Sequence, residues 1–125
     1  MGNLVDIADV SPIDVWGEIV RARRIEGERI TMAIVELAPN AVVPEHRHEN
    51  EQIGIVIRGQ MHFTLDGETR ALGPGGTWRI LTGVPHDAVA GPEGATVIDV
   101  FAPTRRDWDR FEPQAPRPPV WPPAD

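Results

Sequence analysis

The sequence predicts an all-β fold, a sandwich or barrel built from short strands. Turn-forming residues are frequent, with 13 Pro and 12 Gly among 125 residues, and they divide the chain into short apolar runs. Several of these runs alternate apolar and polar side chains, which is the period of a strand with one buried face. Before residue 104, no run keeps the helical period of about 3.6 residues over the length of a helix.

Two strands are expected early in the chain, over residues 18–24 and 30–37, with a turn at residues 26–28 between them. The second of these runs contains several β-branched side chains, which suit a pleated surface. A polar segment that carries two histidines follows.

The middle of the chain predicts a hairpin. Residues 53–57 alternate before Gly59, which we expect to end that strand, and residues 61–65 alternate again. The Asp-Gly pair at residues 66–67 is a strong hairpin signal because both positions must tolerate positive φ. The return strand is expected over residues 69–72.

Three more strands are expected over residues 77–81, 86–90 and 95–101, with breaks at Gly83 and at the Gly-Pro pair of residues 91–92. They follow a Gly-Pro-Gly-Gly turn. The sequence therefore predicts a series of short strands up to residue 101.

The C-terminal region differs from the rest. Residues 105–111 can form a short helical turn, and residues 113–125 are rich in proline. Because proline suits neither a helix interior nor a central strand, we expect these residues to be polyproline-like on the surface or disordered. A proline-rich ligand for another domain is an alternative. We expect one domain over residues 1–112 and a tail over residues 113–125.

Charge and composition exclude several classes of function. The formal net charge is -7, from 19 acidic and 12 basic residues, and there is no basic run to bind nucleic acid or an anionic membrane. The absence of cysteine excludes disulfides, thiol catalysis and zinc–thiolate sites. The N-terminus lacks a signal-peptide pattern, and no apolar stretch approaches the ~18 residues of a membrane span. We therefore expect a cytoplasmic protein.

Three of the four histidines are candidate metal ligands. His46 and His48 are separated by one residue, and on a strand such side chains point to the same face. His86 begins a later strand that a hairpin-rich barrel can bring back to this pair. Gln52 or Glu51 can add an oxygen donor, and such a set suits a divalent metal with open positions. The alternative is a polar loop whose histidines are merely solvated.

These residues also form a pattern that resembles a known family. PEHRH at residues 44–48, followed by Gln52 and Gly59, is similar to the first sequence motif of the cupins, and residues 73–75 (GPG) and 85–86 (PH) are similar to the second. The resemblance implies a double-stranded β-helix, a jelly-roll-like barrel, with its motifs inside about residues 17–103. It also implies one metal ion inside the barrel, held by three histidines and a Glu or Gln.

The resemblance implies a ligand set of His46, His48, Gln52 and His86. In cupins the acid or amide ligand usually lies seven residues before the motif glycine, which favours Gln52 over Glu51. Neighbouring strand residues also face opposite sides, so only one of these two can point inward. A neutral Gln leaves the full charge of the ion (Zn, Ni, Mn or Fe) to attract an anionic or enolate-like oxygen.

The fourth histidine is expected to play no part in this site. His62 alternates with Met61 and Phe63, whose apolar side chains we assign to the core face. We therefore expect His62 to face solvent.

A narrower resemblance concerns DVFAPTRRD at residues 99–107. It is similar to the Asp-Val-Phe-Ser-Pro-Pro-Arg-Glu-Asp ending of the KdgF-type pectin-degradation cupins, which also carry His-x-His-x-x-Glu-Gln. Those proteins convert cyclic 4,5-unsaturated uronates to a linear keto form. The resemblance implies active-site roles for Asp99, Phe101 and Arg105. The sequence departs from that ending at positions 102, 104 and 106.

The chemistry that the resemblance implies is a ring opening assisted by the metal ion. Asp99 would act as general acid or base, Arg105 would clamp the carboxylate of the substrate, and Phe101 would form an apolar wall. From the residues alone, Asp99 can instead face solvent, although an acid among apolar residues is costly when it is buried without a partner. Arg105 can likewise be a solvated arginine in a charged run.

Three functions stay open at this point, because a fold does not choose between them. The first is an isomerase-like or lyase-like metal enzyme that opens an unsaturated uronate. The second is an iron-dependent dioxygenase or a metal lyase acting on another small molecule. The third is a binding protein without catalysis. The expected partners are a small anionic molecule and a second copy of the chain in a homodimer, for which Trp16 and Trp121 are candidate contacts.

Overall fold

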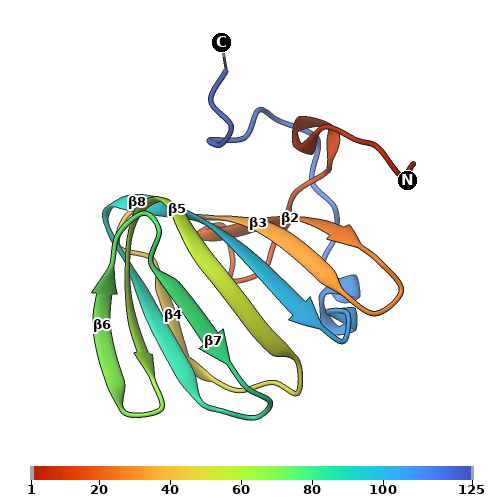
Figure 1. Cartoon of the computed structure of the whole chain (residues 1–125). Helices are drawn as coiled ribbons and strands as arrows, with labels where there is room; N and C mark the ends of the chain where they lie inside the picture. Colours follow the sequence, from red (N-terminus) through yellow and green to blue (C-terminus); the bar gives the residue numbers. More distant parts are fainter. Residues whose placement is uncertain (1, 125) are drawn as a thin grey trace.

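A computed structural model describes residues 2–124 as a β-barrel followed by a short helix and an extended tail (Figure 1). The all-β prediction is confirmed. The elements in chain order are η1 (Ile7–Asp9), β1 (Ile13–Asp14), β2 (Val20–Glu26), β3 (Thr31–Leu37), β4 (Val42–His46), β5 (Glu51–Leu65), β6 (Glu68–Leu72), β7 (Thr77–Ile80), β8 (His86–Ala102) and η2 (Arg106–Arg110).

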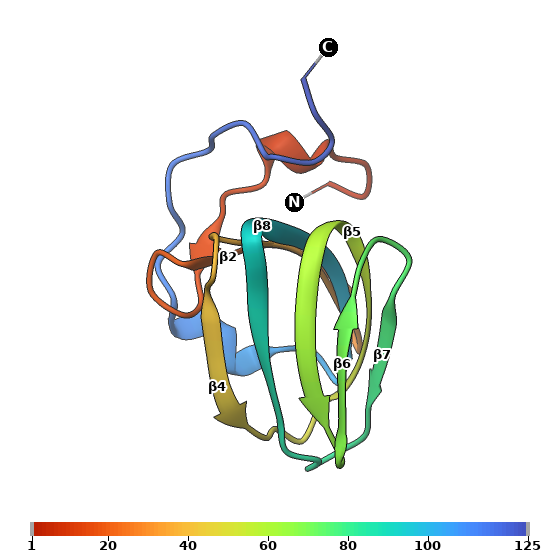
Figure 2. The ribbon, with the colours of Figure 1, turned by 90° about the vertical axis from the view of Figure 1, so that its left-hand side faces the viewer.

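Two long strands, β5 and β8, run through both walls of the barrel (Figure 2). The first half of β5 pairs with β7 and with the second half of β8, which also pairs with β3. The second half of β5 pairs with β6 and with the first half of β8, which also pairs with β4. Strands β1 and β2 extend the first wall beyond β3, and all these pairings are antiparallel.

Neither Gly59 nor the Gly-Pro pair at residues 91–92 ends a strand, so these two predictions are wrong. Strands β5 and β8 bend instead, and the register between them shifts near Gly59. This glycine has a φ of 78°, and a Cβ there would overlap the carbonyl oxygen of Gly94. A bulge at a glycine lets a strand pass from one wall to the other without a turn.

The predicted hairpin forms as expected between β5 and β6. Asp66 and Gly67 both have positive φ, of 48° and 81°, and Leu65 pairs with Glu68. The predicted helical turn near residues 105–111 is also present, as the 3₁₀ helix η2.

The core lies between the two walls, where alternate side chains of each strand point inward. Met61 and Phe63 are buried and His62 is exposed, as predicted from their alternation. In the second half of β8, Val97, Asp99 and Phe101 point inward. An acidic side chain is therefore held on the buried face of the sheet.

The proline-rich tail runs past β2 towards the N-terminal segment (Figure 1). The backbone N–H of Gln114 donates to the carbonyl of Pro12 at 2.8 Å, and Arg23 Nη2 donates to the carbonyl of Arg117 at 2.9 Å. Residues 112–124 contain no helix or strand. In residues 2–124, no helix is long and apolar enough to cross a membrane.

Candidate metal centre and its cavity

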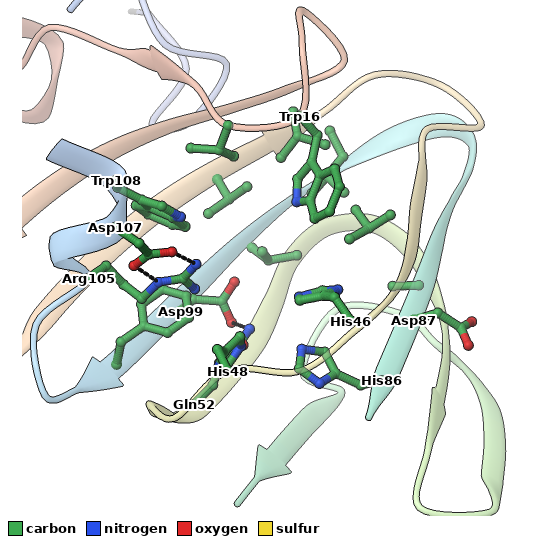
Figure 3. A pocket seen from close by; sticks show the side chains of 18 of the residues that line it. Trp16, His46, His48, Gln52, His86, Asp87, Asp99, Arg105, Asp107 and Trp108 are labelled. Atoms are coloured by element: carbon green, nitrogen blue, oxygen red, sulfur yellow. Dashed lines mark hydrogen bonds and ion pairs between the residues drawn. The ribbon is translucent and has the colours of Figure 1, made fainter. Parts of the chain in front are cut away.

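One cavity of about 480 Å³ contains all the site residues that the sequence predicted (Figure 3). The three candidate histidines line one side of it, and Asp99 and Arg105 line another. The remaining wall is largely apolar, which is typical of cavities that bind small molecules with a few directed polar contacts.

The histidines come together from two strands and a loop. His46 ends β4 and is paired directly with His86, which begins β8. His48 lies in the loop before β5, so the expectation that it shares a strand with His46 is wrong. The chain leaves β4 at His46, and a contact of 2.9 Å between His48 Nδ1 and the carbonyl of Asn50 orients the ring. One ring nitrogen from each of the three histidines lies within 4.8 Å of the others.

Each of the three imidazoles directs Nδ1 to a backbone carbonyl at 2.9 Å, and the partners are Pro44, Asn50 and Val84. A carbonyl only accepts, so Nδ1 carries the proton and Nε2 keeps its lone pair. In the part of the chain that the structure describes, Nε2 of His86 is buried without a hydrogen-bond partner. Backbone carbonyls hold metal-binding histidines in this tautomer.

Gln52 adds an oxygen atom beside these nitrogens. Its Nε2 donates to Asp99 Oδ1 at 2.8 Å, which leaves Oε1 at 3.1 Å from His48 Nε2. A neutral His48 has one N–H, already directed to a carbonyl, so two lone pairs face each other here. A cation between them removes that repulsion, and the donor set therefore fits a divalent metal ion. Glu51 is exposed on the other face of β5.

Burial keeps two of the histidines in the neutral form that binds metals. It lowers the pKa of His86 to about 4. Burial also lowers the pKa of His48, and the charge of Arg105 acts in the same direction. The carbonyl contacts of both rings oppose these shifts without cancelling them.

Asp99 is a buried carboxyl group that receives two hydrogen bonds on one oxygen. Gln52 Nε2 and Trp78 Nε1 both donate to Oδ1 at 2.8 Å. Burial raises the pKa of Asp99 to about 6, although the two donors and the charge of Arg105 lower it. A carboxyl group with such a pKa can both hold and release a proton near neutral pH. The two hydrogen bonds leave Oδ2 for a ligand in the cavity.

Gly54 makes the contact between Trp78 and Asp99 possible. A Cβ at this position would overlap both the indole of Trp78 and Oδ1 of Asp99. Sequence reasoning missed both Trp78 and Gly54. The available signal was a glycine inside an otherwise alternating strand, which marks a close approach of another group.

Arg105 is held rigidly at the cavity rather than solvated, since it is only 8% exposed. Its Nε and Nη2 donate to the two carboxylate oxygens of Asp107 at 3.0 and 2.9 Å. Its Cζ lies 4.6 Å from the ring centre of Phe101 and 4.4 Å from that of Trp108. The guanidinium is thus fixed between two aromatic rings, and Nη1 stays available for an anion.

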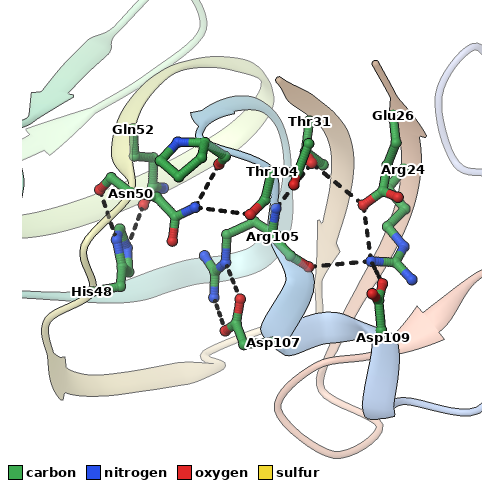
Figure 4. Close-up of polar contacts among 11 residues, drawn as sticks. Arg24, Glu26, Thr31, His48, Asn50, Gln52, Thr104, Arg105, Asp107 and Asp109 are labelled. Atoms are coloured by element: carbon green, nitrogen blue, oxygen red, sulfur yellow. Dashed lines mark hydrogen bonds and ion pairs between the residues drawn. The ribbon is translucent and has the colours of Figure 1, made fainter. Parts of the chain in front are cut away.

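A buried asparagine connects the metal side of the cavity with the arginine side (Figure 4). The backbone carbonyl of Asn50 meets His48, and its side-chain amide donates to the carbonyls of Pro103 and Thr104. Those two residues directly precede Arg105. Sequence reasoning missed Asn50 because its partners lie far away along the chain.

Comparisons with known proteins identify relatives of this chain in sequence and in fold. The cupin domain family matches residues 33–101. The pectin degradation protein KdgF of Dickeya dadantii (strain 3937) is 29% identical over 104 residues, which are 82% of this chain and 94% of that protein. The structure of KdgF from Halomonas sp. is 29% identical, with a TM-score of 0.77 over 86% of this chain and 98% of that one. The polyketide cyclase RemF of Streptomyces resistomycificus is 31% identical, with a TM-score of 0.71 over 82% of this chain and 80% of that one.

Proposed function

This chain belongs to the cupin domain family, and from that premise we propose that it is a metal-dependent enzyme that opens the ring of a small unsaturated uronate. Its similarity to two KdgF proteins, one described as a pectin degradation protein, supports this class of substrate. The observation that carries the proposal is one cavity that holds three convergent imidazoles, one of them with a buried unpartnered nitrogen, together with a buried carboxyl group and a fixed guanidinium.

We propose that His46, His48, Gln52 and His86 hold one divalent ion, which can be Zn, Ni, Mn or Fe. Three imidazoles and an amide oxygen form a neutral donor set, so the charge of the ion is not neutralised by the protein. When bound, such an ion supplies Lewis-acid stabilisation of negative charge on a ligand oxygen.

In the proposed reaction, the hydroxyl on the ring carbon next to the ring oxygen loses its proton. The bond between that carbon and the ring oxygen then breaks, and its electron pair moves to the ring oxygen. The resulting linear molecule carries an aldehyde at the cleaved carbon and an enolate at the former ring oxygen. One proton, equal to the one that the hydroxyl lost, is added to the far carbon of the enolate double bond, and the enolate becomes a ketone. Asp99 Oδ2 is the proposed site at which these protons are held and moved, because burial raises the pKa of this group to about 6.

Arg105 is the proposed clamp for the substrate carboxylate, and Phe101 is the proposed wall beneath it. The pair with Asp107 occupies Nε and Nη2, so the carboxylate would meet Nη1. Because both aromatic contacts already fix the guanidinium, little freedom is lost when a ligand binds.

The test follows the ultraviolet absorbance of the substrate double bond. Unsaturated monouronates from a lyase digest are mixed with the metal-loaded protein, and the expected result is a faster loss of absorbance than in buffer. Chelation of the metal should return the rate to the buffer value. An unchanged absorbance across several unsaturated uronates would refute the proposal.

A polyketide ring closure is a second candidate, because the inner wall of the cavity is apolar. Val35, Leu37, Met61, Phe63 and Val97 line it, and RemF, a polyketide cyclase, is 31% identical to this chain. Ring closure of a linear polyketide without any action on uronates would favour this candidate.

Two other functions have their own signatures. Oxygen uptake by the iron-loaded protein would favour a dioxygenase, and ligand binding without turnover would favour a binding protein.

We also propose that two copies of the chain associate through the outer face of the first wall. Two rows of apolar side chains lie there across β3, β8 and β5. Met32, Val100 and Ile53 form one row, and Ile98 and Ile55 continue the other beside Ile34, which is already buried within the chain. Ile53 is 59% exposed and Met32 is 39% exposed. A second copy presents the same rows, so a two-fold contact buries them together. Sedimentation of Ile53→Lys should show a monomer if this is correct, and an unchanged dimer would refute this face.

A further inference from the structure

We infer that Trp16 belongs to the ligand site, where its indole forms the outer wall against which the flat ring of a small cyclic acid packs. This inference rests on the proposed function for the choice of substrate, since an unsaturated uronate has a flattened ring. Trp16 lies outside the segment that matches the cupin domain family. It is therefore a feature of this chain that the family motifs do not assign.

Trp16 is located at the rim of the cavity, next to the candidate metal ligands (Figure 3). Its ring centre lies 5.4 Å from that of His46, and the two planes are inclined by 58°. Trp16 belongs to the loop between β1 and β2, and its indole lies on the histidine side of the cavity. A ligand bound next to the histidines would therefore lie beside this side chain.

The loop that carries Trp16 is fixed rather than loose. The backbone N–H of Val15 donates to the carbonyl of Val20 at 3.0 Å and closes the loop at its base. Gly17 adopts a φ of 61°, which allows the tight reversal after Trp16. An indole held in place before binding loses little conformational freedom when a ligand packs on it.

Packing within the chain leaves Trp16 incompletely covered, in contrast to the two other tryptophans at the cavity. Trp78 and Trp108 are 5% and 7% exposed, whereas Trp16 is 39% exposed. Trp78 donates to Asp99, and Trp108 packs on Phe101 and Arg105. The exposed part of the Trp16 ring is available to a ligand, and aromatic faces pack well on flat rings.

Taken together, the cavity offers three different contacts to one small molecule. Arg105 Nη1 is suited to a carboxylate, the three histidines are suited to hold a metal ion that binds a ligand oxygen, and Trp16 offers a flat apolar surface. A flattened, unsaturated ring makes closer contact with an indole than a puckered saturated ring does. Trp16 is thereby a specificity-determining residue that favours flat-ringed acids.

The test uses two unreactive acids of similar size, benzoate with a flat ring and cyclohexanecarboxylate with a puckered ring. Dissociation constants are measured by calorimetry with the Zn-loaded protein, for the wild type, Trp16→Phe, Trp16→Ala and the tail variant Trp121→Phe as matched control. We expect Trp16→Ala to weaken benzoate binding about tenfold, and Trp16→Phe and Trp121→Phe to weaken it by less than about threefold. Binding of cyclohexanecarboxylate should change little.

A second readout reports on Trp16 itself. Acrylamide quenches the emission of exposed tryptophans, and bound benzoate should protect part of the wild-type emission but none of the emission of Trp16→Phe. Equal benzoate affinity in wild type and Trp16→Ala, no protection by benzoate, or no benzoate binding to the wild type would each overturn the inference. If benzoate binding depends on Trp16 but no uronate is opened, only the proposed reaction fails. If uronates are opened and Trp16→Ala has an unchanged KM, only the inference fails.

Discussion

The two faces of the wall formed by β2, β3 and β8 each bury an ionisable side chain, and the two side chains are partnered in opposite ways. On the outer face, Arg23 is 0% exposed and donates to the carboxylate of Glu36 and to the carbonyl of Arg117 in the tail. On the inner face, Asp99 is 7% exposed and its hydrogen bonds come from two neutral side chains.

This difference separates a structural role from a chemical one. A buried ion with a counter-ion stays charged and holds its surroundings together, and removal of one partner is strongly destabilising. A buried carboxyl group with only neutral donors has its pKa raised, here to about 6, and such groups beside cavities are common at functional sites. The outer face is therefore expected to affect stability, and the inner face is expected to affect ligand chemistry.

The largest effect is expected for His86→Ala on the inner side. Loss of one imidazole donor should weaken metal binding by more than about 100-fold and abolish activity, because outer contacts of such ligands alone are worth 10–100-fold. Metal content after dialysis, measured by mass spectrometry, is the readout. The exposed His62→Ala is the matched control and should bind metal normally. Equal metal content in His86→Ala and wild type would rule out this ligand set.

The next effect is expected for Asp99→Asn. The amide oxygen can still accept the hydrogen bonds from Gln52 and Trp78, so the fold and the metal content should be preserved. Because the amide cannot exchange a proton, the initial rate of ring opening should fall by about 10²–10⁴-fold. If turnover is unchanged while metal is still bound, the assigned proton-transfer role is wrong.

On the outer side, Arg23→Ala should lower the free energy of unfolding by about 2–4 kcal/mol, because it leaves Glu36 without its buried partner. Arg23→Met keeps the side-chain volume and should cost less. Urea denaturation of the metal-free protein measures this, with Arg70→Ala on the exposed face of β6 as control. Metal affinity should stay the same in all three variants. If Arg23→Ala loses metal affinity but not stability, the outer face does not have the structural role proposed for it.

The smallest effect is expected for Asn50→Ala. Asn50 connects the histidine side of the cavity with the arginine side. Loss of its hydrogen bonds to the loop before Arg105 should lower stability by about 1–2 kcal/mol. The backbone carbonyl that meets His48 remains, so metal affinity should be preserved while KM rises up to about tenfold. A fall in kcat with an unchanged KM would show that Asn50 does not act through Arg105.

Local patterns in the sequence predicted much of the inner face. The alternation of Met61, His62 and Phe63 identified the buried side of its strand, because the side-chain period of a strand is a local property. The inward position of Phe101 together with Asp99 follows from the same rule. The cupin-like spacing favoured Gln52 over Glu51, and the structure turns Gln52 inward, although its role as a ligand stays a prediction.

Other features depend on contacts between distant residues, and no local pattern contains them. Gly59 and the Gly-Pro pair at residues 91–92 have the composition of turns, yet the pairing of β5 with β8 carries both strands past them. Trp78 reaches Asp99 only because Gly54 leaves room between them. Trp16 stays a predicted dimer contact, but only the structure shows that it lies beside His46.

By itself, the sequence determined the all-β class, the set of nitrogen and oxygen donors and the residues that share a strand face. These three features depend on composition and on the alternation of neighbouring residues, and both are local properties of the sequence. Only the tertiary structure decided that one ring nitrogen from each of three histidines converges, that Asp99 has neutral hydrogen-bond donors and that the tail covers Arg23. Such arrangements depend on which strands pair and in which register, and long-range pairing is settled by the packing of the whole barrel.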